Sequence, residues 1–179
     1  MNVIKCILVW LRRLPYCCGF GIQSPTDYAF VREVVNEHGM YYAYGEFRTD
    51  EELREDALHR KLGKLYFRLA NWRQPSLMVQ DTYERYWKAG CKGIQWAASL
   101  TRLELGRMSL EGDYRGKFQR ICGIVDCCSV LVIEGIYHDW GFWHEVEKDV
   151  HTGVTFDLYY CGIVFFDKKR HKKNYKVNF

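Results

Sequence analysis

Hydrophobic positions recur at helical spacing in the N-terminal part of the chain. Apolar residues three or four positions apart predict helices at residues 23–39 and 49–72. The first helix has Ser24 where a hydroxyl side chain caps a helix. The second opens on Thr49, with Glu52 three residues later, which is the pattern of a capping box. We therefore expect this part of the chain to be helical.

From residue 75 onward, short apolar runs alternate with helical patterns. Strands are predicted at residues 76–79, 93–99, 107–112, 129–135, 154–160, 163–166 and 175–179. Helices are predicted between them at residues 83–89, 115–125 and 139–153. The continuous apolar run SVLVIEG implies a strand buried on both faces, as in a parallel sheet. The alternation predicts an α/β domain with a mostly parallel sheet, ending in an antiparallel hairpin with a turn at Cys161-Gly162.

The charge distribution bears on which partners to expect. The chain has 26 Lys and Arg against 22 Asp and Glu, a net charge of +4. Six of the basic residues lie between Lys168 and Lys176, after the last acid, Asp167. The rest of the chain then has 20 basic and 22 acidic residues. Nucleic-acid-binding proteins usually spread positive charge over a face, so this balance does not favour a nucleic-acid partner.

The eight cysteines form neither a metal-binding nor a disulfide pattern. Cys17-Cys18 and Cys127-Cys128 are adjacent pairs, and no C-x-x-C spacing occurs. We expect reduced, buried thiols in a cytoplasmic protein, with no bound metal. The apolar run near the N-terminus is interrupted by Lys5 and is shorter than the ~20 residues that a membrane span needs. An amphipathic helix there would lie on the domain or on a membrane surface, and both alternatives stay open.

Several segments resemble a known family. GFGIQSPTDYAFVREVV at 19–35, with YYAYGE after it, resembles the N-terminal helical segment of a bacterial group of class I S-adenosylmethionine-dependent methyltransferases. That segment carries a Gly-x-His-Ser-Pro motif, in which Gln23 stands here at the His position. SLEGDYR resembles the end of the family's fourth strand. SVLVIEGIYHD at 129–139 and VTFDLYYCGIVFFDKK at 154–169 resemble its later strands.

The resemblance implies a Rossmann-like sheet with an N-terminal helical extension. Residues 1–74 would be a helical segment packed on the domain, and residues 75–179 a reduced methyltransferase-like α/β domain. In the family, a glycine-rich turn after the first strand admits the cofactor, and an acid after the second strand binds its ribose. Here that turn is QDTYER, and no acid follows the second predicted strand until Glu104. We therefore expect a degenerate relative in which one strand–helix unit has been trimmed and no cofactor is bound.

Four acids are predicted at strand ends, along the rim where ligands bind to parallel sheets. These candidate site residues are Asp81, Glu111, Asp113 and Glu134. They would form a ligand site together, or each would cap a helix or face water, and both alternatives stay open. Some related enzymes hold a divalent cation with an acidic pair at the position of Glu134. Here Gly135 follows, so we expect no metal at this position.

The alternative to a degenerate relative is an active methyltransferase with an unusual cofactor loop. Gly90 and Gly93 would then form the glycine turn that binds S-adenosylmethionine, which requires residues 83–88 to be the preceding strand. The other three rim acids would hold the ribose and the amino group. His138 would act as general base beside Glu134 in the catalytic site.

We favour a methyltransferase-like binding or interaction module without efficient S-adenosylmethionine-dependent catalysis. Its partner would be a small molecule or a protein, and a homodimer through an aromatic surface is one form of such an interaction. An active small-molecule methyltransferase is the alternative. A nucleic-acid binder that uses the basic C-terminal segment is the third hypothesis and has the least support.

Overall fold

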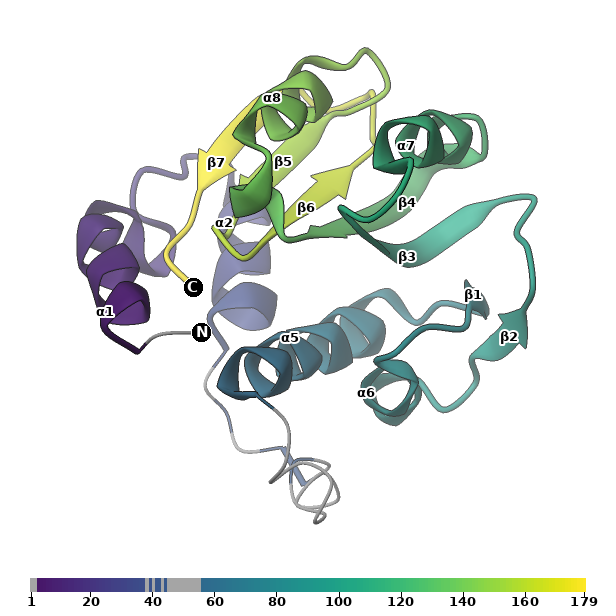
Figure 1. The fold of residues 1–179 in the computed structure, drawn as a ribbon, viewed down its shortest axis with the longest axis horizontal. Helices are drawn as coiled ribbons and strands as arrows, with labels where there is room; N and C mark the ends of the chain where they lie inside the picture. The colour runs from purple at the N-terminus through teal and green to yellow at the C-terminus, as the bar shows by residue number, and fades with distance from the viewer. Residues whose placement is uncertain (1–2, 38, 40, 43, 45–55) are drawn as a thin grey trace. The chain divides into compact units, whose positions relative to one another are not determined.

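The structure is a computed structural model, which describes residues 3–37, 39, 41–42, 44 and 56–179 (Figure 1). The chain divides into two compact units. The first comprises residues 1–74, 82–94 and Phe179, and the second comprises residues 75–81 and 95–178. The expected capping box at Thr49 and Glu52 lies outside the described residues.

The first unit is helical. Its elements are α1 (Val3–Arg12), η1 (Leu14–Gly19), α2 (Pro25–Phe30), η2 (Val31–Val35), α5 (Ala57–Arg73) and α6 (Glu84–Gly90). The predicted cap of α2 is confirmed, because Ser24 Oγ accepts a hydrogen bond from the backbone N–H of Asp27 at 3.3 Å. Helix α5 ends at Gln74, whose left-handed φ of 50° turns the chain out of the helix before Pro75.

Close contact between α5 and α6 forms much of the core of this unit. Tyr66 on α5 stacks on Trp87 of α6 with ring centroids 4.7 Å apart, and both side chains are fully buried. The two backbones approach closely at Gly90, where a Cβ atom would lie 2.2 Å from the carbonyl oxygen of Phe67. Glycine at this position therefore allows the two helices to pack.

A buried arginine joins η2 to α5. Arg68 on α5 donates to the carbonyl oxygens of Val34 and Val35, with distances of 2.6 and 2.9 Å. It also donates to the hydroxyl of Tyr44 at 3.1 Å. The last carbonyl groups of a helix lack hydrogen-bond donors within the helix. Here the Arg68 guanidinium donates to two of them.

The second unit is α/β. Its elements are β1 (Leu77–Val79), β2 (Gln95–Ala97), β3 (Leu103–Ser109), α7 (Tyr114–Cys122), β4 (Val125–Glu134), η3 (Ile136–His138), α8 (Trp140–Lys148), β5 (Val154–Asp157), β6 (Cys161–Phe165) and β7 (Lys173–Lys176). Strands β1 and β2 form a parallel pair. The other strands form a five-stranded sheet in the order β3-β4-β6-β5-β7.

The five-stranded sheet is mixed. Pairs β3–β4 and β5–β7 are parallel, whereas β4–β6 and β5–β6 are antiparallel. The α/β class and the C-terminal antiparallel hairpin are confirmed, but the expectation of a mostly parallel sheet is wrong for this sheet. The reason is that β6, the returning strand of the hairpin, lies next to β4. The predicted turn at Cys161-Gly162 is also wrong, because these residues begin β6 and the turn contains Tyr159 with a φ of 71°.

Helices α7 and α8 cover one face of this sheet (Figure 1). Their buried side chains pack with strand residues in one core, which includes Leu103, Met108, Phe118, Cys122, Leu131, Ile133, Phe142, Trp143, Val146 and Val164. Gly162 on β6 makes room for this packing, since a Cβ atom there would lie 2.2 Å from the Trp143 ring. Within the described residues, no helix is both long enough and apolar enough to cross a membrane.

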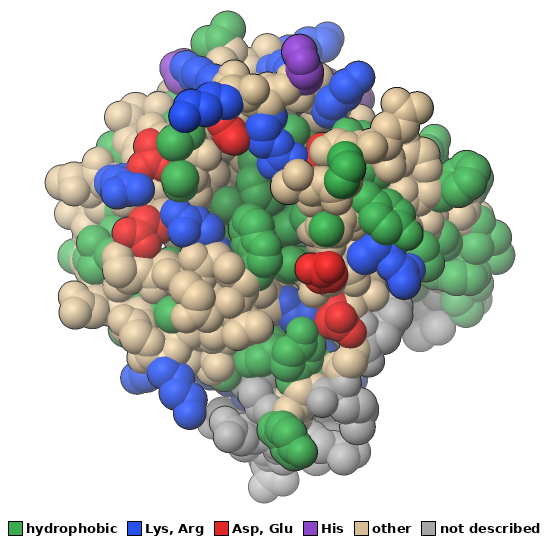
Figure 2. All heavy atoms as spheres, turned by 180° about the vertical axis from the view of Figure 1, so that it is seen from behind, with side chains coloured by type: hydrophobic (Ala, Val, Ile, Leu, Met, Phe, Trp, Pro, Cys, Tyr) green, Lys and Arg blue, Asp and Glu red, His purple; other side chains and the backbone are tan. Residues whose placement is uncertain are grey.

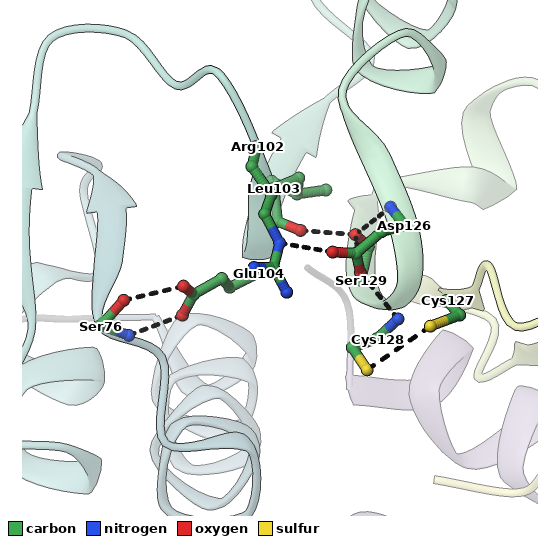
Figure 3. A network of polar contacts seen from close by, with 8 residues as sticks. All are labelled: Ser76, Arg102, Leu103, Glu104, Asp126, Cys127, Cys128 and Ser129. Atoms are coloured by element: carbon green, nitrogen blue, oxygen red, sulfur yellow. Dashed lines mark hydrogen bonds and ion pairs between the residues drawn. The ribbon is translucent and has the colours of Figure 1, made fainter.

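A bulge interrupts the pairing of β3 with β4 (Figure 3). The register shifts between Leu103 and Leu105, so that β4 carries additional residues. Ser129 Oγ donates to the carbonyl oxygen of Leu103 and accepts from the backbone N–H of Asp126, the latter at 2.8 Å. The two cysteines between Asp126 and Ser129 are exposed on the bulge.

Candidate functional site

Two of the acids expected at the strand ends converge on one arginine. Asp81 follows β1, Glu134 is the last residue of β4, and Arg107 lies on β3. Arg107 Nε is 3.1 Å from Asp81 Oδ2, and Arg107 Nη1 is 2.9 Å from Glu134 Oε2. The Arg107 side chain is 13% exposed, and those of Asp81 and Glu134 are 15% and 25% exposed. We call these three residues the Arg107 cluster.

Strand β3 positions the Arg107 cluster because it is linked to both other strands. Ahead of β1, the backbone N–H and hydroxyl of Ser76 donate to the Glu104 carboxylate on β3, each at 2.7 Å (Figure 3). On β4, Glu134 lies opposite Ser109 in a parallel pairing. The Ser76–Glu104 contact thus joins the amino-terminal ends of β1 and β3, and nearer the carboxyl end of β3 Arg107 reaches an acid that follows β1 and one that ends β4.

The Arg107 cluster is an internal ion-pair network in a partly buried place. Charges there attract one another more strongly than they do in water, and removing one member leaves the others in a medium that solvates them poorly. Each carboxylate gives one oxygen to the guanidinium, so a ligand that bound Asp81 and Glu134 would compete with Arg107 for these acids. The arrangement is therefore better suited to hold strand ends together than to bind an added polar group.

The other two rim acids are exposed and are not part of this cluster. Asp113 caps α7, because its Oδ1 accepts a hydrogen bond from the backbone N–H of Gly116 at 2.9 Å. Glu111 accepts a hydrogen bond from the hydroxyl of Ser109 at 3.3 Å. Both contacts are local, as expected for acids that cap a helix or face water.

His138 is exposed at the end of η3, and its ring centroid lies 4.0 Å from that of Tyr137. The next residue, Asp139, caps α8 by accepting from the backbone N–H of Phe142 at 2.9 Å. This backbone hydrogen bond, together with the hydroxyl of Tyr114, holds the pKa of Asp139 below its usual value. A general-base role for His138 stays a prediction.

Gly90 and Gly93 belong to the first unit, whereas the rim acids belong to the second. Gly90 is the last residue of α6 and packs against α5. A Cβ atom at Gly93 would have no neighbour within 4 Å. The alternative cofactor loop needs a strand at residues 83–88, and this expectation is wrong because residues 84–90 are helical.

The basic segment expected near the C-terminus, Lys168 to Lys176, lies in the connection from β6 to β7 and in β7 itself. Most of its side chains are exposed, and Figure 2 shows Lys and Arg side chains gathered close to His side chains in the upper part of the view. One of these lysines makes specific contacts: Lys172 Nζ donates to the hydroxyl of Thr152 at 2.9 Å. The segment is thus partly tied to the fold.

Arg107 is the site residue that the sequence interpretation missed. A basic residue opens the strand predicted at residues 107–112, but the observed strand β3 runs over Leu103–Ser109, which places Arg107 two residues before its end. A side chain two residues before a strand end can reach neighbouring strand ends, so a cation there would be expected to meet the acids.

Comparisons with known proteins identify no relative. No family model, no curated protein and no solved structure matches this chain.

Proposed function

We propose that this protein is a methyltransferase-like binding module that does not use S-adenosylmethionine. The Arg107 cluster is the observation that carries the proposal. In methyltransferases of the resembled family, acids near the strand ends bind the cofactor or, at the position of Glu134 in some members, a divalent cation. Here Asp81 and Glu134 are bound by Arg107 instead, at 3.1 and 2.9 Å.

Two further features support the proposal. The turn after β1 contains no glycine, so its side chains occupy space that the cofactor's methionine part would need. The parallel pairs β1–β2 and β3–β4, each with one helix between its two strands in the sequence, agree with a Rossmann-like origin for these segments. The strand pairing thus supports the proposed relationship to methyltransferases. The residues at the strand ends do not support S-adenosylmethionine-dependent catalysis.

Isothermal titration calorimetry with S-adenosylmethionine tests this proposal. We expect no saturable heat from the full chain, and none from an Arg107→Ala variant, because the glycine turn would still be missing. Arg102→Ala is the matched control, since Arg102 is also paired with an acid, Asp126, but at the amino-terminal ends of β3 and β4. Stoichiometric, tight binding by the unmodified chain would overturn the proposal. Binding gained only in Arg107→Ala would show instead that Arg107 alone closes the site.

A further inference from the structure

Three side chains with metal-ligating atoms meet beside the end of α8. Cys122 is the last residue of α7, and Asp149 and His151 follow α8. One ligand atom from each residue lies within 4.8 Å of those from the other two. His151 Nδ1 is 2.8 Å from Asp149 Oδ1, so two of the three groups are already in contact.

The backbone holds these groups in place. Asp149 Oδ1 accepts a hydrogen bond from the backbone N–H of His151 at 2.8 Å, which folds the His151 ring back toward the carboxylate. Thr152 Oγ1 donates to the carbonyl oxygens of Val146 and Asp149, both at 2.9 Å, and closes the end of α8. Cys122 is buried in the core that α7 and α8 share.

We propose that Cys122, Asp149 and His151 bind a zinc ion. Thiolate, imidazole and carboxylate are the donors that Zn²⁺ takes, at about 2.0–2.3 Å in tetrahedral geometry. Ligand atoms on such an ion lie about 3.5 Å apart, so atoms within 4.8 Å need to close by about 1 Å. Three protein ligands leave the fourth position of the ion for water or for another ligand.

The place holds one carboxylate, that of Asp149, and the Lys172 ammonium lies close by, donating to the Asp149 carbonyl oxygen and to the Thr152 hydroxyl. Burial acts to raise the pKa of Asp149, but hydrogen bonds from the His151 backbone and ring outweigh it and lower that pKa. Burial, helped by the charge of Asp149, raises the pKa of Cys122 to about 11. A thiol must lose its proton to bind zinc, so zinc binding at Cys122 would release a proton.

The same three residue types occur in cysteine nucleophiles, but the surroundings of Cys122 do not fit that role. A reactive cysteine is partly exposed and has a lowered pKa. Cys122 is 7% exposed, and its pKa is raised. Nucleophilic attack by Cys122 is therefore not the chemistry that we propose for this place.

Zinc titration of the full chain in competition with a chromogenic chelator tests the proposal. We expect one zinc ion per chain, with affinity lowered about tenfold or more in Cys122→Ser and in His151→Gln. His144→Gln is the matched control, because His144 Nδ1 also contacts a carboxylate, that of Glu147, at 2.7 Å. This control should bind zinc as the unmodified chain does.

Cobalt substitution gives an independent measurement. A thiolate-to-cobalt charge-transfer absorption is expected from the unmodified chain and should be absent from Cys122→Ser, whose fold is checked by circular dichroism. The adjacent pair Cys127 and Cys128, with Asp126, is the competing soft-metal site. No zinc binding would overturn the proposal, and so would a signal that survives in Cys122→Ser and His151→Gln but is lost in Cys127→Ser/Cys128→Ser.

A separate observation concerns α1, whose apolar side chains are exposed. Ile4, Ile7, Leu8 and Leu11 recur at helical spacing, and between 47% and 65% of each is exposed. Trp10 is also exposed. Residues 1–26 contain no acid, and of the basic residues there, Lys5, Arg12 and Arg13, Arg12 is exposed and Arg13 is buried.

We infer that α1 binds the surface of an anionic membrane, lying parallel to it. An apolar helical face, an aromatic residue and basic charges without acids match the boundary between acyl chains and negative headgroups. A ten-residue helix is too short to span. The inference does not depend on the proposed lack of S-adenosylmethionine binding.

Sedimentation with lipid vesicles tests this inference on the full chain. We expect binding to vesicles that contain phosphatidylserine, less binding at high salt, and little binding to phosphatidylcholine alone. Ile7→Ser/Leu11→Ser should lose binding, whereas Val150→Ser, which changes another exposed apolar residue, should retain it. Absence of vesicle binding would overturn the inference, as would self-association that the double variant abolishes.

Discussion

At the scale of single residues, Arg107 determines what the strand ends of the second unit can do. Without a cation, two carboxylates at neighbouring strand ends would repel each other or recruit a ligand. With Arg107 at 3.1 and 2.9 Å, they instead form a partly buried network. Replacing all members of such a network by apolar residues changes the free energy of unfolding little. Removing one member lowers it strongly, because the remaining charges stay buried without a partner.

We predict that Arg107→Met lowers the free energy of unfolding by about 2 kcal/mol, between the values for exposed and fully buried pairs. Adding Glu134→Gln should recover part of this loss, because it removes one of the two acids that Arg107 neutralises. Urea denaturation of the two single variants and the double variant measures the coupling. Arg102→Met, whose side chain is 59% exposed, should change stability by less than about 0.5 kcal/mol. Strictly additive effects of the two substitutions would contradict the network.

At the scale of elements, the sequence predicted most helices and strands of the second unit, because their apolar spacing is regular. The sequence could not predict the bulge in β4. Hydrogen bonds of Ser129 with the Asp126 N–H and the Leu103 carbonyl oxygen hold this bulge, and the pattern of apolar residues gives no sign of them. It also misplaced the turn before β6. Cys161 and Gly162 resemble turn residues, but Gly162 is a strand residue that makes room for Trp143.

The packing of α6 on α5 gives a prediction with an internal control. Gly90→Ala should lower the free energy of unfolding by about 2 kcal/mol, as overpacking does, because its Cβ atom would lie 2.2 Å from the Phe67 carbonyl oxygen. Gly93→Ala adds a Cβ atom in open space and should change stability by less than about 0.5 kcal/mol. Thermal unfolding of both variants measures the difference. Equal effects would mean that the helices do not approach at Gly90.

The cap of α8 gives a pH-dependent prediction. The backbone N–H of Phe142 and the Tyr114 hydroxyl lower the pKa of Asp139. The charged Asp139 carboxylate therefore stabilises the fold at pH values above its ordinary pKa of 3.8. That contribution is lost as the pH falls through the lowered pKa. Asp139→Asn should therefore be less stable than the unmodified chain at neutral pH, with a difference that shrinks below pH 3.8. A difference that stays constant across this series of urea denaturations would show that the charge is not involved.

At the scale of the whole molecule, strand direction is what the sequence could not supply. The apolar run of β4 indicates burial on both faces, but burial does not distinguish a parallel neighbour from an antiparallel one. The three-residue connection from β5 to β6 fixes only their own pairing. Which of the two lies next to β4 depends on packing across the whole sheet, and β6 occupies that place.

The same topology predicts where the second unit is most stable. Strand β4 pairs with β3 on one side and β6 on the other, and residues 130–133 are at most 1% exposed. Strands β1 and β2 have three residues each, with Val79 and Gln95 exposed. Amide exchange follows local opening, so peptides from β4 should exchange slowest and those from β1 and β2 much faster. Hydrogen–deuterium exchange with mass spectrometry measures this order. Equal protection of β1 and β4 would mean that the two-stranded pair opens only when the five-stranded sheet does.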